Sequence, residues 1–512
     1  MEAFFEVLSS EFTLFTNIFS SVVSFNIFFM VVAGTFLGLV VGAIPGMTAT
    51  MTLALLIGIT YNFGFERAIA LLIGIYVGAI YGGCIASIMI NIPGTPSAAA
   101  TVFDGFPLAK KGEGGLAIGV GTITSFYGMI IGIICLILFT PIVYQIALKI
   151  GAWEYFFLAI FGVAICGNLS SSEQPIKGWI AGFLGLFVST IGLDPIYNYP
   201  RFTFGNSQLL GGIFIIPALI GVFGISEIVN VLKEKVPYSI PKKIGPIIPK
   251  LKTLKKYVTN GIRSGLVGVF IGAVPGVGEA TASFIAYDMA KRASNEPETF
   301  GKGNYQGVVA AETANNACIG GALIPILTLG IPGSVGTALL MAAMIVHGVR
   351  PGPMLRTEFP GFTYHVFILM LIASVAMLVL GLLLARPLIA LLKIRRDILM
   401  PIIVPLCVIG AYAANLRYFD MRVMIVIGIL AYIFRWLEYP LPPLVLGLIL
   451  GDMADVQFRR AMLISGGDPT RVFSRPISVA LIIIIILMLF FSTGIGGRIS
   501  RRISKAFSGS KK

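Results

Sequence analysis

The chain has 512 residues, of which 57% are hydrophobic and 12% are charged. Soluble domains carry about 25% charged residues, so this composition excludes a water-soluble globular protein. Apolar runs of about 18 residues or more are long enough to cross a bilayer. Such runs recur along the whole chain, for example at 116–140, 213–232, 366–385 and 477–495. We therefore predict an all-α polytopic membrane protein with about ten to twelve transmembrane helices.

The net charge of +14 does not indicate nucleic-acid binding, because the basic residues concentrate in loops between apolar segments. The segment from Lys233 to Arg263 holds nine basic residues and one acidic residue, and the tail from Arg498 to Lys512 holds six basic residues. Short loops rich in Lys and Arg stay on the cytoplasmic side of a membrane. We therefore expect both segments, and with them the C-terminus, in the cytoplasm.

In chain order, the sequence repeats itself around four Pro-Gly pairs. Gly42-Ala-Ile-Pro-Gly46 returns as Gly272-Ala-Val-Pro-Gly276, 230 positions later. Asn91-Ile-Pro-Gly-Thr95 returns as Gly330-Ile-Pro-Gly-Ser334, 239 positions later. Interrupted apolar segments at matching positions of two halves point to the binding site of a transporter.

These landmarks divide the chain into five parts. We predict an N-terminal interfacial segment (1–26), a first membrane repeat (27–232), a basic cytoplasmic linker (233–260), a second membrane repeat (261–456), and an extra terminal helix with a basic cytoplasmic tail (457–512).

Counting membrane crossings outward from the linker gives a topology. The loops near Lys110 and Lys302 fall inside, and those near Arg67 and Arg350 fall outside. The Pro-Gly segments at 27–60 and 261–290 become re-entrant hairpins, and the two repeats become inverted. Asp104 falls near the inner interface. Basic residues within 459–475 fall outside, against the positive-inside trend.

Each Pro-Gly pair is expected to break a helix, because Pro lacks a backbone donor and Gly tolerates unusual dihedrals. A break creates a helix N-terminus whose free N–H groups attract an anion. Broken helices survive in a bilayer only when they are buried in protein or line a cavity. Small hydroxyl residues follow the breaks, although close helix packing also favours small residues. The predicted substrate-binding residues are Pro45, Gly46, Thr48, Asn91, Pro93, Gly94, Thr95, Ser97, Pro275, Gly276, Pro332, Gly333 and Ser334.

A polar cluster, Glu312-Thr-Ala-Asn315-Asn316, lies in an apolar segment just before Gly320. Ionisable residues inside a membrane are costly and indicate function. Glu312 and Asn316 are four residues apart and share a helix face. We predict that Glu312, Asn315 and Asn316 bind a coupling cation, either Na⁺ or H⁺; a structural polar network is the alternative.

The sequence contains few residues and motifs that could support catalysis or bind a metal. The five cysteines stand singly, there are two histidines, and no metal-ligand spacing occurs. Motifs of the HExxH and GxSxG types are absent from the sequence. We predict that the chain is not an enzyme, has no catalytic residues, and uses no cofactor or metal beyond the coupling ion.

The chain resembles the large membrane subunit of the tripartite tricarboxylate transporter (TctA-like) family. The matching stretches include Pro45-Gly46, Asn91–Thr95, Ala100–Gly105, Pro275-Gly276, Glu312–Asn316, Thr328–Gly333 and His347–Pro353. The resemblance implies a secondary transporter in a prokaryotic inner membrane that takes up small carboxylates, such as tricarboxylates, with Na⁺ or H⁺. It also implies a small membrane subunit of about four helices and an extracytoplasmic solute-binding protein as partners. Glu279 departs from the family, where we expect a small residue, and this leaves the charge of the substrate open.

Three alternatives remain at this stage. The chain could be a channel, an exporter-type carrier for another small solute, or the membrane subunit of an ATP-driven importer. The sequence carries no P-loop of its own. Solute flux that requires an ion gradient, without ATP, separates these classes. The sequence does not name the substrate.

Overall fold

The computed structural model describes residues 18, 19, 22, 24–170, 174–233, 244–393 and 396–492. Most of the predicted N-terminal segment, part of the basic linker and the basic tail lie outside these residues. The described part is helical except for one short antiparallel ribbon of β1 (Gly192–Leu193) and β2 (Pro200–Arg201). Seven of its helices are long and apolar enough to cross a membrane, and five shorter helices are also apolar. The prediction of an all-α, multi-pass membrane protein is confirmed.

The helices of the first predicted repeat are interrupted where the sequence is rich in Pro and Gly. They are α2 (Phe25–Ala43), α3 (Ala49–Thr60), α4 (Phe65–Ile90), a 3₁₀ turn (Pro96–Ala98), α5 (Val102–Lys110), α6 (Gly114–Ala147), α7 (Ala152–Ser170), α8 (Pro175–Ser189), α9 (Ile215–Leu219), a π-helical segment (Ile220–Ile225) and α10 (Ser226–Lys233).

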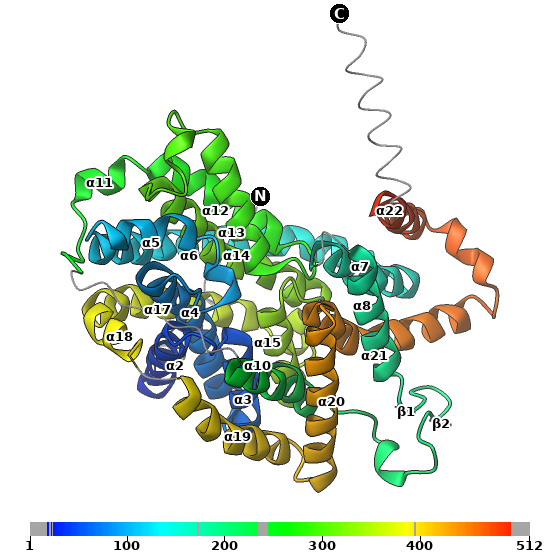
Figure 1. The fold of residues 1–512 in the computed structure, drawn as a ribbon. Coiled ribbons are helices and arrows are strands. Elements are labelled where there is room, and N and C mark those ends of the chain that lie inside the picture. Colours follow the sequence, from blue (N-terminus) through cyan, green and yellow to red (C-terminus); the bar gives the residue numbers. More distant parts are fainter. Residues whose placement is uncertain are drawn as a thin grey trace, which may run out of the picture.

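The rest of the chain continues the same pattern (Figure 1). Its helices are α11 (Leu251–Lys255), α12 (Val258–Gly272), α13 (Gly278–Arg292), α14 (Tyr305–Leu329), α15 (Val335–Val346), α16 (Leu355–Glu358), α17 (Phe362–Leu383), α18 (Ala385–Leu391), α19 (Arg396–Ala413), α20 (Tyr418–Trp436), α21 (Leu441–Ile464) and α22 (Pro476–Ser492), with short 3₁₀ turns at Pro297–Thr299 and Pro469–Ser474.

All four Pro-Gly landmarks follow the end of a helix, as predicted. The helices α2, α4, α12 and α14 end two or three residues before the Pro of each pair. Asn91 and Gly330, at matching positions, terminate α4 and α14 in the left-handed conformation, with φ of 60° and 69°. After the second break, the predicted helix N-terminus does not follow Pro93-Gly94 directly. Only a three-residue 3₁₀ turn follows it, and α5 begins later, at Val102.

Two helix pairs pack closely, α2 with α4 and α12 with α14, and the second helix of each pair is almost fully buried. Their glycines bring the backbones together, because a Cβ atom at these positions would collide with a carbonyl oxygen of the partner helix. The contacts are Gly38 with Ile75 and Gly42 with Ala79 in the first pair, and Gly268 with Ala314 and Gly272 with Cys318 in the second. The offsets are again 230 and 239 positions, so the sequence repeat is also a repeat of contacts.

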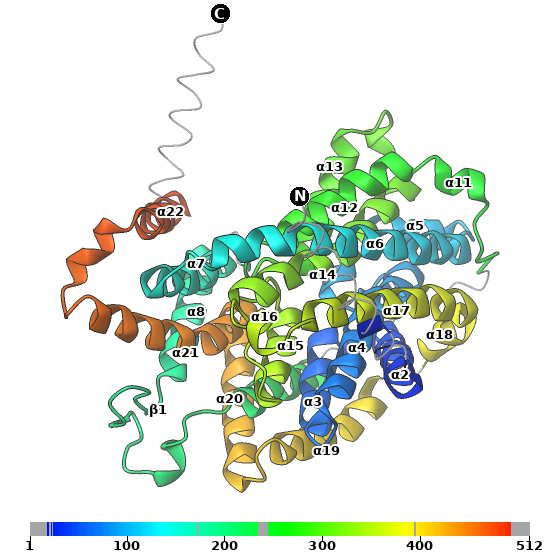
Figure 2. The same cartoon turned by 180° about the vertical axis from the view of Figure 1, so that it is seen from behind.

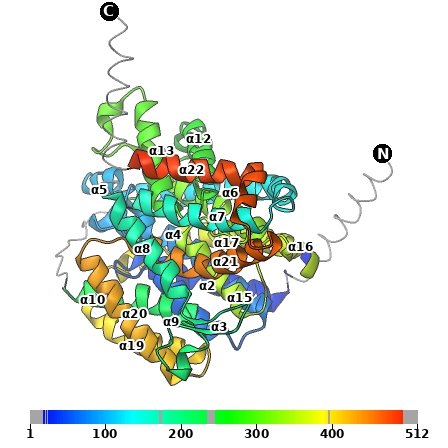
Figure 3. The same cartoon turned by 90° about the vertical axis from the view of Figure 1, so that its right-hand side faces the viewer.

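The other helices pack against these two pairs or against one another. Helix α6 packs against α14, and α17 packs against α2, α4 and α6. Helices α19 and α20 contact the π-helical segment on one flank of the molecule, as seen from behind in Figure 2. On another flank, α21 packs against α7 and α8, and α22 lies across α7 (Figure 3). The interrupted segments are therefore enclosed within protein.

Loops that the topology predicts on one side do lie together. Lys111 Nζ donates to the Lys302 carbonyl at 2.7 Å, and Gly115 N donates to the Ile244 carbonyl at 2.5 Å. Among the segments that the topology predicts on the other side, the Arg356 guanidinium of α16 lies over the ring of Tyr144 near the end of α6. These contacts group the loops into two sets, whereas the side of the membrane that each set faces stays a prediction.

Asp104 is fully buried inside the protein and lies against the loop that contains Lys302, so its predicted place near the inner interface stays a prediction. Its Oδ1 accepts the backbone N–H groups of Gly301, Gly303 and Asn304 at 2.8–2.9 Å. Its Oδ2 accepts the Tyr287 hydroxyl at 2.9 Å. The carboxylate therefore ties α5 of the first repeat to the loop between α13 and α14 of the second.

Candidate substrate and cation sites

A cavity of about 430 Å³ lies where the four breaks converge. Of the predicted substrate-binding residues, Thr48, Thr95, Ser97 and Gly276 line it, and Val335 lines it from the start of α15. These residues come from segments separated by up to 287 positions in the chain. The structure thus brings together the hydroxyl residues and the breaks that the sequence placed apart.

Hydroxyl groups and a helix N-terminus furnish one wall of the cavity. Thr48 is the N-cap of α3, and its Oγ1 accepts the Met51 N–H at 3.1 Å. The Thr48 and Thr50 hydroxyls lie 2.9 Å apart, as do those of Thr95 and Ser97. Hydroxyl groups and helix N-termini can donate hydrogen bonds to a carboxylate without a buried basic residue.

The cavity lining also carries a negative charge. Gly276 and Gly278 have positive φ values of 77° and 73°, and Glu279 follows in the first turn of α13. The Glu279 carboxylate accepts a hydrogen bond from the Tyr76 hydroxyl, which lies 2.9 Å from Ser334 Oγ. Among the described residues that line the cavity, Glu279 is the one acidic side chain and none is basic.

The other predicted substrate-binding residues shape the breaks and do not line the cavity. They are Pro45, Gly46, Asn91, Pro93, Gly94, Pro275, Pro332, Gly333 and Ser334. Two of them have equivalent packing roles, because a Cβ atom at Gly94 would meet the Gly42 carbonyl and one at Gly333 would meet the Gly272 carbonyl. Ser334 caps α15 in a capping box with Thr337 and joins the site through Tyr76.

Sequence reasoning missed several lining residues outside the breaks, and it missed Tyr76. Phe223, Phe284 and Pro442 contribute apolar surface to the cavity. The π-helical segment places Phe223 there, and a π-helical turn often marks a functional site. The closely spaced prolines at 440–443 could have signalled a further interrupted segment.

The predicted cation residues lie on α14, away from the cavity lining. Glu312 is fully buried. Its Oε1 accepts the Thr101 hydroxyl at 2.5 Å, and its Oε2 accepts the Ser125 hydroxyl at 3.1 Å. Asn316 Nδ2 donates to the Glu312 backbone carbonyl at 3.0 Å. A buried carboxylate is thus held between the two repeats by hydroxyl groups.

Several polar atoms beside Glu312 have no hydrogen-bond partner among the described residues. They are Thr313 Oγ1, Asn315 Oδ1 and Nδ2, and Asn316 Oδ1, all in fully buried side chains. Buried polar atoms are nearly always paired, because an unpaired one costs about 1–3 kcal/mol. Unpaired oxygens around a carboxylate fit a hard cation, which prefers oxygen ligands.

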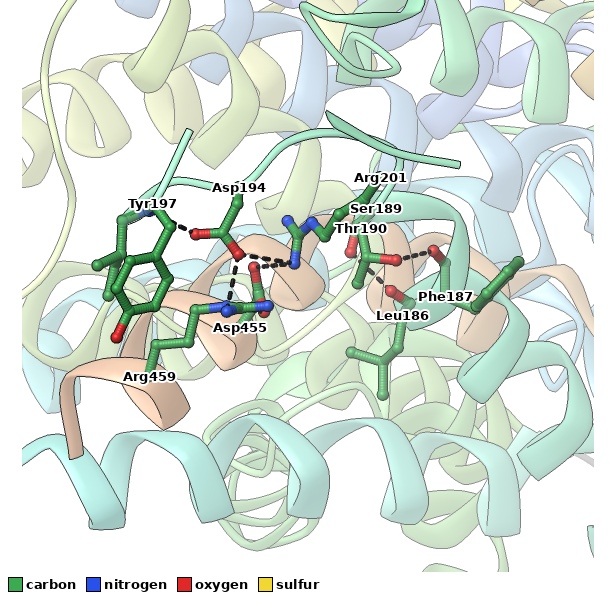
Figure 4. Close-up of polar contacts among 10 residues, drawn as sticks. Leu186, Phe187, Ser189, Thr190, Asp194, Tyr197, Arg201, Asp455 and Arg459 are labelled. Carbon is green, nitrogen blue, oxygen red and sulfur yellow. Dashed lines mark hydrogen bonds and ion pairs between the residues drawn. The ribbon is translucent and has the colours of Figure 1, made fainter. Parts of the chain in front are cut away.

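A second polar cluster lies near the β ribbon and was not predicted (Figure 4). Arg459 contacts the carboxylates of Asp194 and Asp455 at 2.7 and 2.9 Å. Arg201 pairs with the same two carboxylates, at 3.7 and 2.9 Å. The two acids neutralise the two arginines, so Arg201 and Arg459 contribute no net charge to this end of the molecule.

The carboxyl group of Asp194 is held ionised by its surroundings. Burial opposes ionisation, but the backbone N–H groups of Tyr197 and Ile196 and the guanidinium groups of Arg459 and Arg201 together lower its pKa below the ordinary value. A cavity of about 520 Å³ adjoins this cluster, but none of the predicted site residues line it. The cluster therefore organises the loop rather than the predicted substrate site.

The fold and the central cavity define a multi-pass membrane protein whose interrupted helices surround a polar site, which is the architecture of a transporter. The chain belongs to the Tripartite tricarboxylate transporter TctA family, whose sequence model matches residues 28–446. Family membership makes it a component of a tripartite transporter, a class that works with other subunits and a binding protein.

Two proteins of Agrobacterium vitis are similar to this chain. An uncharacterized 52.8 kDa protein in the TAR-I ttuC' 3' region is 34% identical over 426 residues, covering 83% of this chain and 84% of that protein. An uncharacterized protein in the TAR-II ttuC' 3' region is 38% identical over 215 residues, covering 42% of this chain and 89% of that protein. No solved structure matches the chain.

Proposed function

We propose that the protein is a secondary active transporter that couples the uptake of small carboxylates, such as tricarboxylates, to Na⁺ or H⁺. The observation that carries this proposal is the 430 Å³ cavity at the convergence of the four breaks. Transporters of the inverted-repeat type bind substrate at broken helices near the bilayer midplane. The repeated contacts of α2–α4 and α12–α14 support two equivalent repeats. We propose that these repeats are inverted, an arrangement that can open the cavity to one side of the membrane and then to the other.

Substrate carboxylates bind the hydroxyl wall of the cavity. Thr48, Thr95 and Ser97 offer donors, and α3 directs its N-terminus toward the same wall. An anion is favoured at a helix N-terminus by the helix dipole and the free N–H groups. This arrangement binds carboxylates without a basic side chain, which would be costly to bury in the membrane.

Coupling to a cation follows from the membrane potential. Moving one negative charge inward against 100 mV costs about 2.3 kcal/mol. Accumulation of a carboxylate therefore needs positive charge that moves with it. Glu312, Asn315 and Asn316 supply the cation site, since a carboxylate held by two hydroxyls lies beside unpaired amide oxygens.

The proposed assembly follows the family. The chain spans a prokaryotic inner membrane with its C-terminus in the cytoplasm, and it works with a small membrane subunit of about four helices. An extracytoplasmic solute-binding protein delivers the substrate. Support comes from family membership and from the grouping of the basic loops near Lys111 and Lys302.

The test of this function is uptake into cells that express the full transporter with its neighbouring subunits. Citrate, malate and lactate serve as radiolabelled probes, each measured with and without Na⁺ and pH gradients. We expect gradient-dependent accumulation of at least one probe, and its loss when Thr95 is replaced by Trp, with membrane insertion retained. Gradient-independent flux of all three probes would support a channel and contradict the proposal.

The cation site is tested by Glu312→Gln, Asn315→Ala and Asn316→Ala in the same assay. Under Na⁺ coupling, Glu312→Gln should transport with a weaker Na⁺ dependence. Under H⁺ coupling, it should lose accumulation and retain exchange. Glu298→Gln, an exposed site, is the matched control. Unchanged ion dependence in all three variants would assign the polar cluster a structural role only.

A further inference from the structure

We propose that the Glu279 carboxylate occupies one half of a two-fold carboxylate site, so that this chain takes substrates with a single carboxylate in preference to di- and tricarboxylates. The inference rests on the proposed function of the central cavity, and it adds the charge of the substrate. The correspondence between the two repeats, the hydrogen-bonded group around Glu279 and the absence of basic side chains from the described cavity lining support it.

The two sequence offsets, 230 and 239, assign a counterpart in the other repeat to each residue of the group around Glu279. The offset of 230 matches Glu279 with position 49, which is alanine. The offset of 239 matches Tyr76 with Asn315, and Ser334 with Thr95. The group Tyr76, Glu279 and Ser334 therefore has the counterpart Asn315, Ala49 and Thr95.

The same offsets hold in the geometry around these residues. Gly94 abuts the Gly42 carbonyl as Gly333 abuts the Gly272 carbonyl. The left-handed residues that end α4 and α14 also match. Both Glu279 and its counterpart Ala49 line the cavity, from opposite repeats. The cavity therefore contains two equivalent positions, which we call half-sites, and they differ in whether the protein supplies a carboxylate.

In the first half-site the protein supplies the carboxylate itself. The Tyr76 hydroxyl donates to Glu279 and lies 2.9 Å from Ser334 Oγ, at the N-cap of α15. This is the set of donors that a ligand carboxylate would find here if position 279 were small. Glu279 thus fills a position that would otherwise accept a second carboxylate of the substrate.

In the second half-site the carboxylate is missing. Ala49 ends at Cβ, and the counterpart of Ser334, Thr95, lines the cavity with its hydroxyl 2.9 Å from that of Ser97. A ligand carboxylate placed beside Ala49 can accept hydrogen bonds from these two hydroxyls. Asn315, the counterpart of Tyr76, lies outside the cavity lining and belongs to the cation site proposed beside Glu312.

Charge makes the two half-sites selective. A ligand with one carboxylate can place it in the second half-site, but a second carboxylate on the ligand would then approach Glu279. At an effective dielectric constant of about 20, two like charges about 6 Å apart correspond to a loss in affinity on the order of 100-fold. No basic side chain among the described lining residues offsets it. A hydroxyl or ammonium group, in contrast, could donate to Glu279.

Calorimetric titration of the purified full-length chain tests the inference with lactate, malate and citrate, 2-hydroxy acids with one, two and three carboxylates. We expect the wild type to bind lactate at least about tenfold more tightly than malate or citrate. Glu279→Ala, which makes the position match Ala49, should raise the malate-to-lactate affinity ratio on the order of 100-fold. Glu279→Gln, which keeps the volume and removes the charge, should raise it less. Glu298→Ala, at an exposed site, should leave the ratio unchanged.

A second variant fills the other half-site. Ala49→Glu should abolish lactate binding, with the elution volume and melting temperature of the protein retained. The inference is overturned if wild type prefers malate or citrate, or if neither Glu279 variant changes the ratio while the probes still bind. If Glu279→Ala does not fold, the malate-to-lactate affinity ratio of Glu279→Gln decides whether the inference holds. Absence of binding by every probe to every variant overturns the proposed function as well.

Discussion

One added methyl group at Gly94 or Gly333 tests the backbone packing that holds the second and fourth breaks in place. A Cβ atom at Gly94 would lie 2.8 Å from the Gly83 Cα, and one at Gly333 would lie 2.7 Å from the Ala322 Cα. Carbon atoms in contact prefer separations of about 3.5–4.0 Å. Because the obstructing atoms belong to the backbone, the segments must separate by about 1 Å.

The cost of this separation has a known range. Overpacking of a close-packed interior typically costs about 1–3 kcal/mol. Thr95 follows Gly94 directly and lines the cavity, so the shift also moves a proposed substrate donor. We expect Gly94→Ala to lower the melting temperature of the purified protein by a few degrees and to reduce uptake at least about tenfold. Gly333→Ala should behave in the same way, because its contacts match those of Gly94.

The control is Gly64→Ala, where the added Cβ would meet only the Arg67 side chain, at 3.7 Å or more. It should melt and transport like the wild type. The assay pairs thermal melting in detergent with uptake by cells at equal expression. Wild-type melting and uptake in both Gly94→Ala and Gly333→Ala would refute the close contact and the equivalence of the two repeats.

Two further outcomes follow from the structure. Single cysteines at Lys110 and Arg350 should react with an impermeant thiol reagent from opposite sides of the membrane, and labelling from the same side would contradict the predicted topology. Asp194→Asn should lower the melting temperature at pH 7, because Arg459 loses a carboxylate partner. The folded pKa of Asp194 is depressed, so its stabilisation is present above the unfolded value of about 3.9 and is lost as the pH falls through the folded value. The difference between wild type and variant should therefore persist from pH 7 to about 5 and narrow below about pH 4, whereas a constant difference would exclude an ionic role.

The breaks were predictable from the sequence because Pro and Gly act locally. A Pro-Gly pair disrupts a helix wherever it stands, and the two register offsets alone matched Gly42 with Gly272. The hydroxyl residues next to the breaks, such as Thr48 and Thr95, line the cavity for the same reason. A local signal was sufficient for this part of the site.

The contacts between the repeats could not be predicted in this way. Tyr76 and Glu279 are 203 positions apart, and neither has a spacing that identifies the other. The lysines after Asp104 indicated an interfacial position, but no local pattern indicated that its carboxylate binds a loop almost 200 positions away. Such pairs depend on how the two repeats pack, which a single sequence without an alignment does not encode in any local pattern.

The difference between the two offsets, nine residues, has an energetic consequence. Between α3 and α4 the chain needs only residues 61–64, whereas between α13 and α14 it uses residues 293–304, and the end of that longer loop binds Asp104. Two identical inverted repeats would relate the inward-open and outward-open states by a two-fold rotation, so that the two states have equal free energy. In the proposed cycle, the face that carries the Asp104 tie must break four hydrogen bonds to open, and its counterpart position, Ala343, offers no such tie. We therefore expect the longer loop to make the free energies of the inward-open and outward-open states unequal. The resting protein should then favour the state that is open at the opposite face.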